Sequence, residues 1–283
     1  MTTSMMETHT ADIGGIPMRW MESGEGPPVV LVHGIPTGPL LWRKVAPRLT
    51  GARVMAWEMV GYAGSIKAGI GRDISVAHQA DYLSMWMRHA GITGAVVVGH
   101  DLGGGVAQIL AVRHPSLVGG LVLTNAITHD SWPIPSVKAL RATAELTEHL
   151  PPPAVKAIFA TLFARGHDDA DLADEAMAIH WPFYADADPA AALLRQIRAL
   201  DVNDTLAVSE RIGMLEIPAS IVWGANDEFQ KLESGHRLAQ QLKAPLDAIE
   251  GGKHFVPEDH ADRIAVAIQS VVQRVQEGIP LPG

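Results

Sequence analysis

The chain has 283 residues, of which 47% are hydrophobic, and a formal net charge of −9 at pH 7. A chain of this length and composition can bury a full hydrophobic core, so we do not expect a disordered protein. The negative charge opposes nucleic acid and anionic membrane surfaces as partners, and the absence of cysteine excludes disulfides, a thiol nucleophile and zinc–thiolate sites.

Strand-like apolar runs alternate with helical segments through most of the chain. An antiparallel hairpin is expected first, formed by Ala11–Ile13 and Met18–Glu22. Further strands are predicted at Val29–His33, Val54–Glu58, Ala95–His100, Leu121–Asn125, Ala219–Trp223 and Leu246–Ile249. Helical spacing marks the segments Leu40–Leu49, Ser75–Ala90, Gly103–His114, Leu232–Leu242 and Asp259–Val275. This alternation predicts the fold class α/β, as a doubly wound, mostly parallel sheet with helices on both faces.

The alternation breaks between residues 130 and 205. This span has no strand-like run, contains the proline-rich pieces Trp132–Pro135 and Pro151–Pro153, and otherwise has the spacing of short helices. An insertion at this point of the topology would lie over the carboxyl ends of the strands, where ligands bind in open α/β sheets. We therefore predict a core domain of residues 1–129 and 206–283, and a helical cap domain of residues 130–205.

Two sequence features bear on location and on metals. Residues 1–10 lack the basic start and the apolar stretch of a secretory signal, and no apolar run is long enough to span a membrane. We therefore expect a soluble, cytoplasmic protein. The histidines are scattered, without the short paired spacings that are typical of metal ligands, and we expect no bound metal.

A turn of the form Gly-x-Asp-x-Gly follows the β-branched run Val96–Val98 and opens a helical stretch. Such a strand-to-helix elbow exposes one side chain at the top of a sheet, which here is Asp101. A carboxylate is ionised at neutral pH and attacks a saturated carbon without help from a base. Because water can cleave the resulting aspartyl ester, Asp101 favours ring opening or halide displacement over ordinary ester hydrolysis.

The turn after the first core strand is expected to meet this elbow. Gly34 lets the backbone bend sharply after His33, so that the N–H of Ile35 can point into the same space as the N–H of Leu102. Two such donors form an oxyanion hole for the tetrahedral intermediate of ester hydrolysis. The sequence therefore predicts Ile35 and Leu102 as backbone donors near Asp101.

An acid and a histidine follow two later strands. Asp227 comes after the strand that ends at Trp223, and His254 comes after the next strand. Both residues therefore lie at the same sheet edge as Asp101. We predict that His254 takes a proton from the water that cleaves the ester, and that Asp227 fixes the tautomer of His254 and stabilises its charged form.

These motifs resemble the α/β-hydrolase superfamily, in the aspartate-nucleophile branch that contains epoxide hydrolases and haloalkane and fluoroacetate dehalogenases. The resemblance covers nearly the whole chain. Haloalkane dehalogenases of this branch usually hold the halide with a tryptophan directly after the nucleophile, often together with an asparagine, where this chain has Leu102 and Ile35. Fluoroacetate dehalogenases clamp a carboxylate with arginines, where this chain has Leu102 and Gly105. Both departures weigh against dehalogenation.

The resemblance also implies which residues surround the leaving group. Epoxide hydrolases usually protonate the ring oxygen with two cap tyrosines, and Tyr184 is the one candidate in the predicted cap. The further candidates near the leaving group are His180, Trp181, Trp132, Asn125 and His33. Asn125 stands where some dehalogenases place the acid of the triad, so the acid here is expected to be Asp227.

The leading prediction is a hydrolase that acts through a covalent aspartyl ester, as an epoxide hydrolase on a hydrophobic small molecule. A haloalkane or haloacid dehalogenase is the first alternative. A cofactor-independent lyase or cyclase, or a non-catalytic small-molecule binding protein on the same fold, remains open. We expect no cofactor, and a monomer or homodimer.

Overall fold

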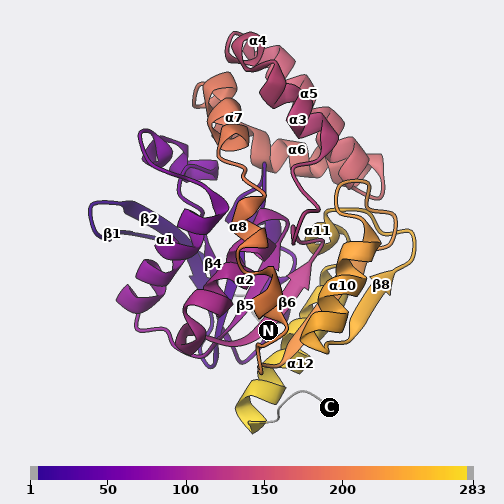
Figure 1. Ribbon diagram of the computed structural model, residues 1–283. Helices are drawn as coiled ribbons and strands as arrows, with labels where there is room; N and C mark the ends of the chain where they lie inside the picture. The colour runs from indigo at the N-terminus through magenta and orange to yellow at the C-terminus, as the bar shows by residue number, and fades with distance from the viewer. Residues whose placement is uncertain (1–5, 279–283) are drawn as a thin grey trace.

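The computed structural model describes residues 6–278 and contains one eight-stranded sheet (Figure 1). Its strands are β1 (Glu7–Asp12), β2 (Pro17–Ser23), β3 (Pro28–Val32), β4 (Arg53–Trp57), β5 (Ala95–His100), β6 (Val118–Thr124), β7 (Ala219–Gly224) and β8 (Leu246–Ile249). Their order in the sheet is β1-β2-β4-β3-β5-β6-β7-β8. β1 and β2 form an antiparallel hairpin that pairs antiparallel with β4, and all later pairs are parallel.

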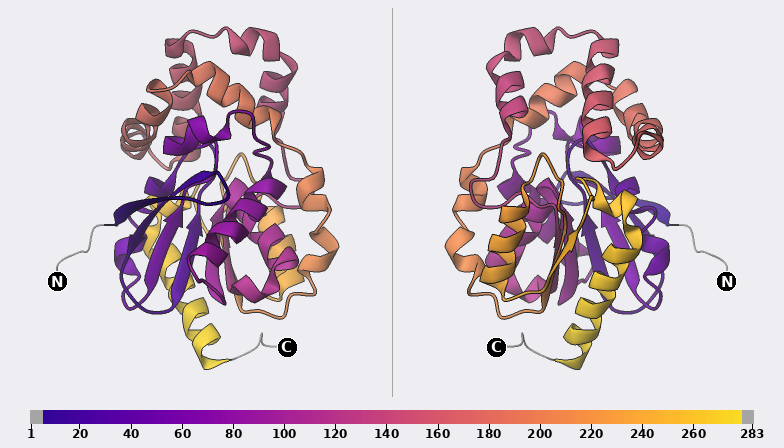
Figure 2. Two further views of the ribbon diagram at one scale, coloured as in Figure 1. Left: turned by 90° about the vertical axis from the view of Figure 1, so that its left-hand side faces the viewer. Right: turned by 90° about the vertical axis from the view of Figure 1, so that its right-hand side faces the viewer.

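The central strands are buried on both faces, which explains their continuous apolar sequences. Every residue of β5 and of β7 is buried. Helices α1 (Val76–His89), α2 (Leu102–Arg113) and α10 (Leu232–Leu242) pack into the hydrophobic core on one face. Helix α12 (Ala261–Glu277) packs into the core on the other face (Figure 2). The predicted α/β fold with helices on both faces is confirmed.

The expected helix at Leu40–Leu49 is wrong. The chain there forms two short 3₁₀ turns, at Pro39–Trp42 and Ala46–Arg48. Pro39 is the first residue of one turn and Pro47 the second residue of the other, and proline lacks the N–H that an α-helix interior needs. The apolar periodicity of this segment nevertheless points inward, because Leu41, Trp42 and Val45 are fully buried.

The span between β6 and β7 is helical. It contains α3 (Pro135–Ala142), α4 (Ala144–Glu148), α5 (Pro152–Gly166), α6 (Ala170–Ala185), α7 (Pro189–Arg198), α8 (Asn203–Leu206) and α9 (Ser209–Ile212). Helices α3 to α7 pack on one another and stand above the carboxyl ends of the strands (Figures 1 and 2). We call α3 to α7 the helical insertion. Helices α8 and α9 instead contact α1 or α2 of the core.

The predicted division into residues 130–205 and the rest stays a prediction. Residues 1–5 and 279–283 of the predicted core lie outside the described residues. Within residues 6–278, no helix has the length and apolarity needed to cross a membrane.

Candidate active site

Asp101 occupies the turn between β5 and α2. Its backbone has φ 51° and ψ −119°, a conformation that residues other than glycine rarely adopt. The turn requires close contacts with neighbouring loops, since a Cβ atom on Gly103 would lie 2.2 Å from the carbonyl oxygen of Val32. A Cβ atom on Gly34 would lie 2.4 Å from Asp101 Oδ2. The glycines around the elbow therefore let the two strand-end loops meet at Asp101.

The carboxylate of Asp101 is buried and is held by a backbone donor. The N–H of Ile35 donates to Asp101 Oδ2 at 3.0 Å. Burial raises the pKa of Asp101 above the ordinary range of a carboxyl group, and the nearby His254 and the N–H groups of Ile35 and Leu102 oppose this rise. The structure thus places both predicted backbone donors beside Asp101.

His254 and Asp227 form a buried pair next to Asp101. The distance from His254 Nδ1 to Asp227 Oδ2 is 2.8 Å, and the N–H of Phe229 donates to Asp227 Oδ1 at 2.7 Å. Burial lowers the pKa of His254, but the charge and hydrogen bond of Asp227 outweigh this and raise it above the usual value. Burial likewise opposes the charge of Asp227, yet His254 and its other hydrogen bonds hold the pKa of Asp227 low. The contact therefore favours an ionised Asp227 and a more basic His254. Because Nδ1 of His254 faces Asp227, the ring can accept a further proton at Nε2.

Asn125 supports this pair and does not contact the cavity above Asp101. Its Nδ2 group donates to Asp227 Oδ2 at 2.6 Å, and its Oδ1 atom accepts from the N–H of Gly224 at 3.1 Å. The expectation that Asn125 lies at the leaving group is therefore corrected. Its amide is fully used in orienting Asp227 and in joining the ends of β6 and β7.

A cavity opens above Asp101 and His254, and its walls are mainly apolar. The lining residues besides these two are Ile35, Leu102, Ile127, Trp132, Pro133, Ile134, Val137, Leu162, Leu200, Phe229 and Gln230. They come from both the core loops and the helical insertion. The walls of the cavity therefore offer mainly apolar contacts.

Two polar side chains in the walls differ in their availability. Trp132 was expected near the leaving group and does line the cavity, but its Nε1–H donates to Thr205 Oγ1 at 2.7 Å. Gln230 accepts at Oε1 from Ser131 Oγ at 2.8 Å. Among the described residues, no acceptor is hydrogen-bonded to Gln230 Nε2. The amide of Gln230 therefore remains available to a bound molecule.

The sequence motifs do not identify Gln230 as a residue of this cavity. It lies three positions after Asp227, in the loop that follows β7, between apolar neighbours. A polar residue in a loop that also carries a predicted catalytic acid was the available signal. The direction of its side chain depends on the local turn, which the sequence motif does not specify.

Three insertion residues expected at the leaving group lie elsewhere. Tyr184 does not line the cavity, because its hydroxyl donates to Gln196 Oε1 at 2.9 Å inside the core of the insertion. Trp181 packs edge-on against Phe159 at 5.6 Å between ring centres. His180 faces Glu258, with 3.0 Å between Nε2 and Oε1. These expectations are corrected, because each side chain is occupied by a partner within the fold.

His33 is also a structural residue. Its Nε2 atom accepts from the N–H of Met59 at 3.1 Å, and its Nδ1 lies 3.0 Å from the carbonyl oxygen of Gly34. Complete burial lowers the pKa of His33 to about 4. A neutral ring therefore joins the loops after β3 and β4, and the expected contact of His33 with the leaving group is corrected.

Comparisons with known proteins identify the family of this fold. The chain matches the alpha/beta hydrolase fold family over residues 27–261. A haloalkane dehalogenase from Mycolicibacterium paratuberculosis is 25% identical over 284 residues, covering 94% of this chain and 90% of that protein. The crystal structure of an alpha/beta hydrolase fold protein from Burkholderia ambifaria has a TM-score of 0.84 and 25% identity, covering 93% of this chain and 97% of that one.

An epoxide hydrolase, CorEH, shares the fold with a TM-score of 0.73 and 20% identity, covering 95% of this chain and 99% of its own. At this identity the likeness concerns the fold alone. The family match and the curated relative go further. This chain belongs to the alpha/beta hydrolase family, and it is similar to the dehalogenase-like branch of that family.

Proposed function

We propose that this protein hydrolyses a small, apolar alkyl halide through an ester formed on Asp101. The observation that carries the proposal is the juxtaposition of a buried carboxylate, the His254–Asp227 pair and an apolar cavity above them. In the first step a carboxylate oxygen of Asp101 bonds to the carbon, and the halide leaves with the electron pair of the broken carbon–halogen bond. No proton moves in this step.

The second step hydrolyses the ester and regenerates the carboxyl group of Asp101. Water attacks the carboxyl carbon of the ester while His254 Nε2 takes its proton. The N–H groups of Ile35 and Leu102 stabilise the negative oxygen of the tetrahedral intermediate. The intermediate collapses by breaking the bond from the carboxyl carbon to the alkyl oxygen, which receives the proton and departs as an alcohol. Asp227 stabilises the charged His254 meanwhile.

The hydrogen-bond donors in the cavity support a halide over an epoxide. An opening epoxide develops an alkoxide, which needs a proton from an acidic group, whereas a halide needs only a hydrogen bond. The amide of Gln230 donates a hydrogen bond and does not release its proton. Tyr184 donates to Gln196, and burial raises the pKa values of both Tyr184 and Tyr62, which makes them poorer acids.

Gln230 also answers the sequence argument against dehalogenation. Leu102 supplies no side-chain donor after the nucleophile, but Gln230 reaches the same cavity from the loop after β7. The similarity of this chain to a haloalkane dehalogenase adds support from outside the structure. We therefore favour a halide over an epoxide oxygen as the leaving group.

Trapping the ester tests the proposal. The variant His254→Gln removes the base of the second step, so we expect bromoalkanes to add one alkyl group to the peptide that contains Asp101. Mass spectrometry measures the adduct, and released bromide should equal it in amount. The double variant with Asp101→Asn is the control and should give neither.

Epoxides of the same chain length run beside the bromoalkanes. If only epoxides give an adduct, and the unmodified enzyme forms a diol from them, the substrate is an epoxide and the proposed alkyl halide is wrong. Turnover of any substrate without an adduct, and without transfer of labelled water oxygen to Asp101, would contradict the ester mechanism and favour lyase or cyclase chemistry. Binding without turnover or adduct would identify a binding protein.

A further inference from the structure

The junction between α5 and α6 contacts the loop that carries His254. The carbonyl oxygen of Gly166 accepts from the N–H of His254 at 2.9 Å and from the N–H of Phe255 at 3.0 Å. Lys253 donates its backbone N–H to Asp168 Oδ1 at 2.9 Å. Its Nζ group donates to the carbonyl oxygen of His167 at 2.7 Å. Three consecutive residues of the His254 loop are thus bonded to three consecutive residues of the helical insertion.

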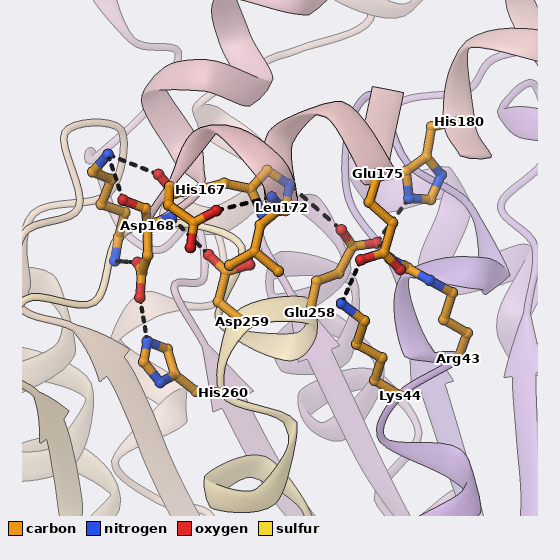
Figure 3. Close-up of polar contacts among 12 residues, drawn as sticks. Arg43, Lys44, His167, Asp168, Leu172, Glu175, His180, Glu258, Asp259 and His260 are labelled. Atoms are coloured by element: carbon orange, nitrogen blue, oxygen red, sulfur yellow. Dashed lines mark hydrogen bonds and ion pairs between the residues drawn. The ribbon is translucent and has the colours of Figure 1, made fainter. Parts of the chain in front are cut away.

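The side chains of Asp259 and His260 add further contacts to the junction (Figure 3). Asp259 Oδ1 lies 2.7 Å from His167 Nδ1, and Asp259 Oδ2 accepts from the N–H of Asp168 at 2.9 Å. His260 Nε2 lies 2.7 Å from Asp168 Oδ2. The junction and the loop therefore bond reciprocally, since each supplies both backbone groups and side chains.

A buried charged cluster extends this contact toward the rest of the insertion. Glu258 is buried and pairs with Arg43 and with His180, and its second oxygen lies 3.4 Å from His167 Nε2. Arg43 also donates to Glu175 of α6 at 2.8 Å (Figure 3). Removing one member of a buried charge group leaves its partners unpaired, which is costly, so the cluster resists separation of the insertion from the core.

Apolar packing at the junction leaves little freedom for the loop. A Cβ atom on Gly166 would lie 2.5 Å from Phe255 Cε2, so the backbone touches the ring directly. The ring of His167 stacks on Phe255 with 4.7 Å between centres. Phe255 in turn contacts the ring of His254 at 4.9 Å. A displacement of the junction would therefore displace His254 as well.

We propose that the α5–α6 junction, residues 166–168, is a positioning element for His254, so that the helical insertion controls hydrolysis of the ester separately from its formation. The proposal rests on the proposed function. Asp101 needs no base to attack the substrate, so ester formation requires no proton transfer to His254. Ester hydrolysis does, because His254 Nε2 must reach the attacking water.

Neighbouring aspartates provide a matched pair of variants. Asp168→Ala removes the acceptor of the Lys253 N–H and the partner of His260. The adjacent Asp169 caps α6 by accepting from the N–H of Leu172 at 3.0 Å, and makes no hydrogen bond to the His254 loop among the described residues. Asp169→Ala therefore weakens the insertion at the same place without touching the loop.

We expect Asp168→Ala to slow ester hydrolysis roughly 10- to 100-fold, as for a misplaced catalytic group, and to change ester formation less than about threefold. The ester should then accumulate on Asp101 during turnover, measured by mass spectrometry of quenched reactions beside the release of bromide. Asp169→Ala should change neither step more than about twofold. An equal loss in both steps, or equal behaviour of the two variants, would overturn the positioning role.

A second measurement separates this inference from the proposed function. If His254→Gln forms no adduct with any substrate, the ester mechanism fails, and the position of His254 is then followed by NMR titration of its ring. A loosened contact with Asp227 lowers the pKa of His254, so Asp168→Ala should lower it and Asp169→Ala should not. An unchanged pKa in a folded Asp168→Ala variant would reject the positioning role whatever reaction the protein catalyses.

Discussion

The strand-end loops of the core and the helices of the insertion differ in how their polar side chains are used. In the core, Asp101 and His254 line one cavity and Asp227 pairs with His254, as the order of the strands implies. In the insertion, Tyr184 and His180 point to partners within the fold. The ends of parallel strands share an edge by topology, whereas the direction of a helical side chain depends on the rotation of the helix, which packing decides.

The largest effect on activity should come from Gln230, which lies on the core side of the cavity. Gln230→Leu removes the free amide, and a lost hydrogen bond to a developing anion should lower the rate of bromide release roughly 10- to 100-fold. Single-turnover measurement of bromide isolates this step. Ser131→Ala is the control, since it keeps the amide donor and should cost less. An unchanged rate in Gln230→Leu would remove Gln230 from the leaving-group site.

Low pH should separate the two proposed steps, ester formation and ester hydrolysis. His254 must be neutral to take a proton, and its pKa is raised because Asp227 outweighs the opposing effect of burial. Ester hydrolysis should therefore fall about tenfold for each pH unit below that raised pKa. Charged His254 favours the carboxylate of Asp101, so ester formation should persist and the adduct should accumulate. A rate of ester hydrolysis that stays constant through this range would exclude His254 as the base.

The smallest effect on activity should come from Tyr184, on the insertion side. Tyr184→Phe leaves Gln196 Oε1 without its donor, which should lower the free energy of unfolding by about 1–3 kcal/mol. Turnover should change less than about threefold, because this hydroxyl does not reach the cavity. Denaturant unfolding and steady-state kinetics measure the two effects. A loss of turnover comparable to that of Gln230→Leu would restore Tyr184 as the acid of an epoxide hydrolase.

Much of the core was predictable because its signals are local and repeated. The buried strands are short apolar runs, and the elbow at Asp101 is specified by glycines that no larger residue replaces without a clash. The 3₁₀ turns at Pro39 and Pro47 were not predicted, because the apolar periodicity of this segment indicated a helix despite its prolines. The direction of Tyr184 escaped for a different reason. Its partner Gln196 lies on another helix, and no pattern in the sequence reports how two helices of an insertion rotate against each other.

The reciprocal bonding of residues 166–168 with residues 253–260 affects how this chain can change in evolution or by engineering. An insertion replaced as a block would bring foreign residues against Lys253, Asp259 and His260. The exchangeable part of the molecule therefore does not coincide with the continuous segment between β6 and β7. Recombination preserves a matched unit when it keeps the α5–α6 junction, together with His180 and Glu175 of α6, in the same molecule as the His254 loop and Arg43.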